Sequence, residues 1–95
     1  MRGAERARQV YGEEHIWIAE IYSKIALTYY KKGNNQLAST WIRRSFIVCH
    51  KSVGEGHKAL TIIYVHLQKI ESARKSVLVN APIESIEYKI RSLLE

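Results

Sequence analysis

The sequence predicts an all-α fold of antiparallel helical hairpins, closed by a short capping helix at the carboxyl end. Two observations carry this expectation. Apolar side chains recur at the spacing of one helix face in four successive segments, and short stretches rich in glycine, asparagine or proline separate the segments. The chain has 95 residues, of which 46% are hydrophobic and 25% are charged. This composition is ordinary for one small globular domain.

The first expected helix covers residues 13 to 32. Apolar side chains recur along it at intervals of three and four residues, which places them on one face. They are Ile18, Ala19, Tyr22, Ile25, Ala26 and Tyr29. Gly33, Asn34 and Asn35 follow, and because glycine and asparagine accept a left-handed backbone, the chain is expected to reverse direction there.

A second helix is expected to run antiparallel to the first and to end near Gly54. Its stripe has the same spacing and consists of Leu37, Ala38, Trp41, Ile42, Ser45, Val48 and Cys49. Cys49 is therefore expected to be a buried, unreactive thiol. As the single cysteine it cannot form a disulfide within the chain, which favours a reducing setting, cytoplasmic or nuclear.

Two further helices are expected in the second half of the chain. The helical spacing continues from Lys58 to about Val79, and Pro82 then marks the first turn of a last helix, because proline is disfavoured in a helix interior. The third stripe consists of Leu60, Ile63, Tyr64, Leu67, Ile70, Arg74 and Val77, and the fourth of Ile83, Ile86, Ile90, Leu93 and Leu94. The last helix is expected to cap an otherwise open end of the fold.

The most specific pattern is an internal recurrence. The stretch Gly-Glu-Glu-His at positions 12 to 15 returns 42 positions later as Gly-Glu-Gly-His at positions 54 to 57, with one hairpin between the copies. Over this unit the sequence resembles the kinesin-light-chain type of tetratricopeptide repeat, whose pattern opens with glycine and histidine where Gly12 and His15 stand. The resemblance implies a superhelix of helical hairpins. It also implies that His15 and His57 fix the start of each first helix.

The resemblance divides the chain into parts of one domain. Residues 4–11 correspond to the end of a partial repeat, 12–53 to a full hairpin, 54–79 to a degenerate repeat helix and 80–95 to the capping helix. The second copy departs from the repeat pattern: Gln68, Glu71 and Lys75 stand where Ala26, Tyr29 and Gly33 stand in the first copy. The repeat array is therefore expected to end there.

Residues 11 to 77 also resemble the carboxyl-terminal repeat domain of MYND and SET lysine methyltransferases. The resemblance rests on the Tyr-Gly-x-x-His stretch at positions 11 to 15 and on the later Gly-x-x-His. The catalytic half of that family is missing from the sequence, and one cysteine cannot supply a MYND zinc module. A chain of this kind would be the regulatory or partner-binding lobe of such an enzyme.

The expected partner-binding site is a groove on the first helix. In stacked hairpins of the repeat family the first helices line the concave side, and the resemblance assigns that side to Glu20, Ser23, Leu27, Tyr30 and Lys31. The periodicity also places these residues off the core stripe, and their mixture of polar, apolar and charged groups suits a bound peptide. The alternative is an ordinary solvated helix face. Trp17 and Trp41 either belong to the core or mark a contact surface.

No set of residues indicates an enzyme, a cofactor or a metal site. Cys49, His50 and His57 are the nearest group of ligand types, but they lack the paired spacing of a zinc site. The acidic residues at positions 13, 14 and 55 fall at expected helix starts, where the helix dipole stabilises carboxylates without any catalytic duty. The glycines lack the spacing of a phosphate loop, and no apolar run is long enough to cross a bilayer.

Two classes of function follow from these observations. The first is a scaffold that binds a protein or peptide partner, a neighbouring repeat or a second copy of the chain. The second is a basic helical domain that binds nucleic acid, suggested by the net charge of +6 and the interspersed tyrosines. The scaffold is favoured, because the sequence contains no RNA-binding motif and its first helix is longer than those of compact helix-turn-helix domains.

Overall fold

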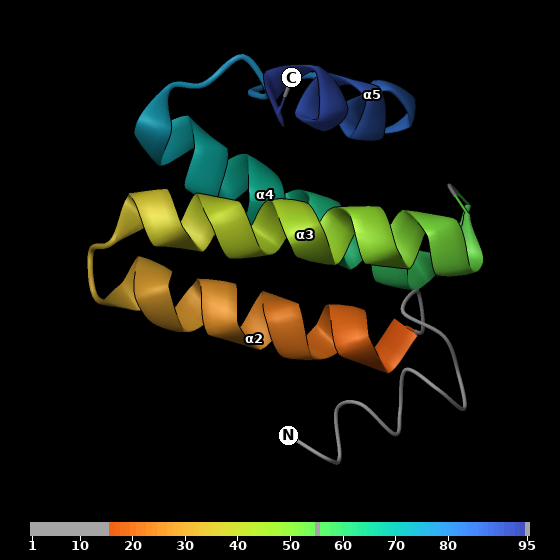
Figure 1. The fold of residues 1–95 in the computed structure, drawn as a ribbon, viewed down its shortest axis with the longest axis horizontal. Coiled ribbons are helices and arrows are strands. Elements are labelled where there is room, and N and C mark those ends of the chain that lie inside the picture. Colours follow the sequence, from red (N-terminus) through yellow and green to blue (C-terminus); the bar gives the residue numbers. More distant parts are fainter. Residues whose placement is uncertain (1–15, 55, 95) are drawn as a thin grey trace.

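A computed structural model describes residues 16–54 and 56–94 of the chain. These residues form four helices and no strand: α2 (Ile16–Lys31), α3 (Asn35–Val53), α4 (Lys58–Arg74) and α5 (Ile83–Leu94) (Figure 1). The all-helical fold expected from the periodicity is therefore confirmed. The partial repeat at residues 4–11, the first Gly-x-x-His motif and the acidic residues at positions 13, 14 and 55 lie outside the described residues.

Helices α2 and α3 form the expected antiparallel hairpin (Figure 1). Gly33 adopts a left-handed backbone with φ of 84° in the turn between them. Asn34 caps α3, since its side-chain oxygen accepts a hydrogen bond from the backbone N–H of Leu37 at 3.2 Å. The predicted turn is thus confirmed, and α3 ends near Gly54 as expected, with Val53 as its last residue and Gly54 as its C-cap.

Small side chains lie where α2 and α3 pack together. Ala19 and Ala26 on α2 and Ala38 on α3 have no exposed surface, which is consistent with two closely packed helices. Ser45 stands on α3 where the repeat pattern has alanine, and its hydroxyl donates a 2.6 Å hydrogen bond to the Ala19 carbonyl. Of the predicted α2 stripe, the larger residues Ile18, Tyr22, Ile25 and Tyr29 are only half-buried.

Helix α4 packs against α3 and also contacts α2. His57 caps its first turn, because the imidazole Nδ1 accepts a hydrogen bond from the backbone N–H of Ala59 at 3.0 Å. This agrees with the role expected for that histidine. The buried residues Leu60, Ile63, Leu67 and Ile70 continue the core from α3 into α4 as the periodicity predicted.

The predicted extension of α4 to Val79 is wrong, because the helix ends at Arg74. Lys75 takes a left-handed backbone with φ of 56°, and its N–H bonds to the carbonyls of the last helical turn. Val77, the last residue of the predicted apolar stripe, therefore lies outside the helix and is 65% exposed. Leu78 is buried instead, in the connection that follows the helix.

Two side chains of α4 hold the connection between α4 and α5. The Gln68 amide donates to the Leu78 carbonyl at 2.8 Å and accepts from the Asn80 N–H at 2.7 Å. The Tyr64 hydroxyl donates to the Ala81 carbonyl at 2.6 Å. From the sequence, Gln68 is only a departure from the repeat pattern, in which alanine stands at this position. In the structure its side chain makes two hydrogen bonds that an alanine could not make.

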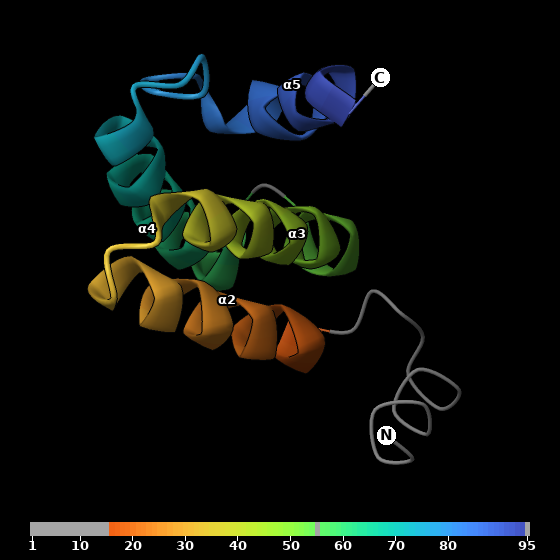
Figure 2. The ribbon, with the colours of Figure 1, turned by 60° about the vertical axis from the view of Figure 1, so that its left-hand side comes forward.

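Helix α5 packs against α3 on the side away from α2 (Figures 1 and 2). Its buried residues are Ile86 and Ile90, while Leu93, which belonged to the predicted stripe, is 49% exposed. His50 of α3 and Glu87 of α5 add a polar contact of 2.8 Å between the two helices. The expected capping helix is therefore present, and it covers α3.

Candidate functional site

An open groove lies between α2 and α4, which run in the same direction because each is antiparallel to α3 (Figure 1). It encloses about 290 Å³. Residues from α2 and α4 line it, namely Ile16, Glu20, Ser23, Lys24, Leu27, Ala59, Ile62, Ile63 and His66. Glu20 and Lys24 bring opposite charges to a lining that is otherwise largely apolar. We call this feature the α2–α4 groove.

The five residues assigned to the groove from sequence fall in different places. Glu20, Ser23 and Leu27 line the α2–α4 groove, although Ser23 is only 9% exposed and contributes little surface. Tyr30 is half-buried against the core and lies outside the lining, as does Lys31, which is exposed at the last residue of α2.

Sequence reasoning missed the α4 side of the groove. The 42-residue recurrence signals one of its residues, because a shift of 42 positions carries Glu20 onto Ile62, whereas it carries Leu27 onto Lys69. Ile62 lines the groove and is 50% exposed, so it offers an apolar contact on the wall that faces α2. Lys69 lies outside the lining, with its ammonium 5.6 Å from the centre of the Tyr30 ring.

A buried carboxylate joins α3 to α4 near the other end of α4. Glu71 has no exposed surface, and both of its oxygens accept hydrogen bonds from the Arg43 guanidinium, at 2.8 and 2.9 Å. The Ser39 hydroxyl also donates to it, and Arg74 donates to the same hydroxyl at 2.9 Å. From the sequence, Glu71 is only a departure from the repeat pattern, because it stands where the first copy has Tyr29.

The environment of Glu71 keeps it ionised. Burial alone raises the pKa of its carboxyl group, since an ion is less stable away from water. Hydrogen bonds from Arg43, Ser39 and Ser76, together with the charge of Arg43, outweigh that effect and leave the pKa below its ordinary value. No buried side-chain nitrogen or oxygen in the described part of the chain lacks a hydrogen-bond partner. The network is therefore a satisfied ionic contact between two helices.

Cys49, His50 and His57 each have a separate structural environment and do not form one site. Cys49 has no exposed surface, and burial, followed by the negative charge of Glu20, raises the pKa of its thiol. His50 contacts Glu87 and His57 caps α4. Within residues 16–54 and 56–94, no three histidine, cysteine or acidic side chains are grouped as metal ligands.

Two aromatic residues, Tyr22 of α2 and Trp41 of α3, pack together across the hairpin. The rings of Tyr22 and Trp41 lie 5.4 Å apart, and the guanidinium of Arg44 is 5.1 Å from the centre of the Trp41 ring. Trp41 also packs against the core, whereas Trp17 is 38% exposed. Ile21, one helical turn after Trp17, is 41% exposed.

No protein-family model matches the sequence, and searches of curated proteins and of solved structures gave no match. The resemblance to tetratricopeptide repeats therefore stays a prediction. In the part of the chain that the structure describes, no helix combines the length and the apolar character needed to span a membrane.

Proposed function

We propose that the chain is a non-catalytic scaffold that binds a protein segment in the α2–α4 groove, in a cytoplasmic or nuclear setting. The observation that carries the proposal is the groove itself: about 290 Å³, open to solvent, between two helices that run in the same direction. A groove of this kind accommodates a helical or extended segment whose apolar side chains enter between the helices.

The chemistry of the lining supports this reading. Leu27 and Ile62 provide apolar surface from opposite walls, while Glu20, Lys24 and His66 provide polar groups beside it. Apolar contacts with a few polar groups that set the orientation are typical of peptide-binding surfaces. The proposal assigns no cofactor and no catalytic residue.

Selection of peptides from a displayed random library tests the proposal. Peptides selected on the wild-type chain should perturb the backbone amide resonances of residues around Leu27 and Ile62. Ile62→Glu should weaken their binding by about tenfold or more, because the variant places a charge on the apolar wall. Val77→Glu is the matched control, since Val77 is 65% exposed and lies outside the groove lining.

Three outcomes would contradict the proposal. They are failure to select any peptide, resonance changes confined to another surface, and equal loss of binding in Ile62→Glu and Val77→Glu. A circular dichroism spectrum of each variant shows whether the helices are intact. The nucleic-acid alternative, which the net charge of +6 favours, is tested by titration with RNA and DNA at several salt concentrations. Micromolar or tighter binding with a steep salt dependence would support that alternative.

A further inference from the structure

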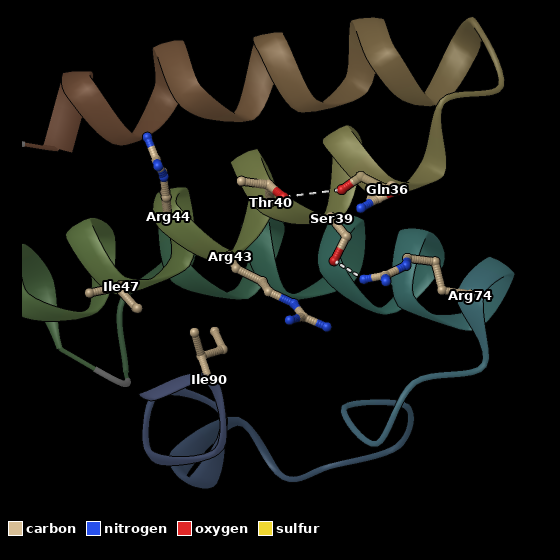
Figure 3. A pocket seen from close by; sticks show the side chains of 8 residues that line it. All are labelled: Gln36, Ser39, Thr40, Arg43, Arg44, Ile47, Arg74 and Ile90. Carbon is tan, nitrogen blue, oxygen red and sulfur yellow. Dashed lines mark hydrogen bonds between the residues drawn. The ribbon is translucent and has the colours of Figure 1, made fainter. Parts of the chain in front are cut away.

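A second cleft lies between α3, the end of α4 and α5, away from the α2–α4 groove (Figure 3). It has a volume of about 320 Å³. Its lining consists of Gln36, Ser39, Thr40, Arg43, Arg44, Ile47, Arg74 and Ile90. We call it the arginine cleft. One end is formed by the aliphatic side chains of Ile47 and Ile90, and the rest is polar or cationic.

Two guanidinium groups point into the space between α3 and α5 (Figure 3). Arg43 uses Nε and Nη2 to hold Glu71, which leaves donors at the outer end of its planar group. Arg74 has one hydrogen bond, from Nη1 to the Ser39 hydroxyl. Arg44 extends toward α2 instead, where it lies over Trp41, so it contributes charge to the rim but no donor to the centre.

The charges around the cleft are not balanced. None of the described residues that line it is acidic, and the nearest carboxylate in the network, Glu71, is buried beneath it and held by Arg43. Two guanidinium groups at the centre, those of Arg43 and Arg74, therefore lie beside one carboxylate, and Arg44 adds a further positive charge at the rim. A phosphate monoester carries a charge of about −1.5 to −2 at pH 7, which suits this excess better than a singly charged carboxylate does.

We infer that the arginine cleft binds a phosphate monoester group. Arg43 and Arg74 donate to its oxygens through their outer N–H groups, because the planar fork of arginine fits phosphate oxygens in pairs. Gln36, which also lines the cleft, adds a neutral donor. Ile47 and Ile90 pack against the carbon atoms next to the ester oxygen. The site is independent of the scaffold proposal, since the two linings share no residue.

Titration with small phosphate compounds tests the inference. The probes are inorganic phosphate, O-phosphoserine and phenyl phosphate, with serine as the comparison that lacks the phosphate group and a single-stranded oligothymidylate that has hydroxyl ends as the phosphodiester comparison. We expect the monoesters to perturb the resonances of Ser39, Arg43 and Arg74. Binding should strengthen as pH rises through the second phosphate pKa, at about 6, because the dianion then predominates. Phenyl phosphate should bind more tightly than inorganic phosphate because its ring meets Ile47 and Ile90.

Two variants separate the site from general attraction to a basic surface. Gln36→Glu places a carboxylate in the cleft lining, and because the residue lies in the first turn of α3, the change favours the helix dipole and should leave the fold intact. Arg74→Gln removes one of the two central donors. Each should weaken phenyl phosphate binding by about tenfold or more. Lys32→Gln, at an exposed residue outside the cleft, should change it by less than about twofold.

The inference is overturned if Gln36→Glu folds and binds phenyl phosphate like the wild type, or if Lys32→Gln loses as much affinity as Arg74→Gln. It is also overturned if the oligothymidylate binds at least as tightly as the monoesters with resonance changes spread over many lysines. That result would indicate nucleic-acid binding by the surface as a whole. Ile62→Glu, in the α2–α4 groove, should leave phosphate binding unchanged.

Discussion

At the scale of single residues, the feature with the largest consequence is the buried Glu71 carboxylate. A buried ion is stable only when it is paired and fully hydrogen-bonded, and Glu71 meets both conditions through Arg43 and Ser39. Because Arg43 retains a side-chain exposure of 19%, the pair connects the core to the surface of the arginine cleft. The contact therefore joins α3 to α4 and also sets the position of Arg43.

The first residue-scale prediction concerns pH. The folded-state pKa of Glu71 lies below its ordinary value of 4.5, so its stabilising effect is complete above that pH and is lost as pH falls through the folded-state pKa. Glu71→Gln should lower the free energy of unfolding at pH 7 by about 3 kcal/mol, since it leaves Arg43 without its charged partner. Urea unfolding between pH 7 and pH 3 measures both effects.

The variant should also lose less stability on acidification than the wild type does. Glu84→Gln is the control, because Glu84 is an exposed carboxylate on α5, and a change of less than about 0.5 kcal/mol is expected there. Equal unfolding free energies for wild type and Glu71→Gln at pH 7 would show that the contact contributes nothing to stability.

At the scale of elements, the ends of the helices show how the two halves of the chain are related. Gly33 and Lys75 stand 42 positions apart, and both adopt a left-handed backbone within two residues of a helix end, at α2 and α4, with φ of 84° and 56°. The two positions that correspond in the proposed repeat therefore share a left-handed backbone although their residue types differ. Left-handed geometry carries a steric cost for lysine that glycine does not have.

The element-scale prediction is that Lys75→Gly stabilises the protein. Glycine removes the steric cost at the end of α4, and the expected gain in unfolding free energy is about 0.5 to 1 kcal/mol. Ser72→Gly, an exposed change inside the same helix, should instead cost about 1 kcal/mol. Thermal unfolding should therefore give a higher melting temperature than the wild type for Lys75→Gly and a lower one for Ser72→Gly. A lower melting temperature for Lys75→Gly would show that the lysine side chain contributes more than its backbone conformation costs.

At the scale of the whole molecule, the proposed repeat scaffold would have few neighbouring units against which to stack, and repeat proteins gain much of their stability from such neighbours. The outer face of the hairpin, around Trp17, Tyr22 and Trp41, is the surface where a preceding repeat is expected from the sequence. Tyr22 and Trp41 are half-buried, and Ile21, which precedes Tyr22 in the sequence, is 41% exposed. We therefore propose that this face is covered by a second copy or by a partner chain.

Analytical ultracentrifugation tests this proposal, because the sedimentation coefficient shows whether the chain associates. The chain should associate at micromolar concentration, and Ile21→Lys should shift it toward monomer, because the variant places a charge on the contact face. Ile62→Lys, which changes a similarly exposed isoleucine in the α2–α4 groove, should sediment like the wild type. A folded monomer that is independent of concentration would contradict the prediction and show that the helices close their own core.

The sequence by itself determined the elements that depend on local spacing. Three-to-four periodicity located the four helices, and Gly33 and Gly54 marked the ends of α2 and α3, because helix faces and left-handed turns are properties of neighbouring residues. On α2 it also indicated Glu20 and Leu27 as groove residues. The end of α4 was missed because Lys75 carries no local turn signal.

Only the tertiary structure decided what the second half of the chain contributes. Whether Glu71 is a solvated acid or a buried ion depends on Arg43, which lies 28 positions away in sequence. The α4 wall of the α2–α4 groove and the arginine cleft likewise arise where distant helices pack together. Such long-range contacts leave no periodic trace in the sequence, so their charges and cavities became visible only when α3, α4 and α5 were placed side by side.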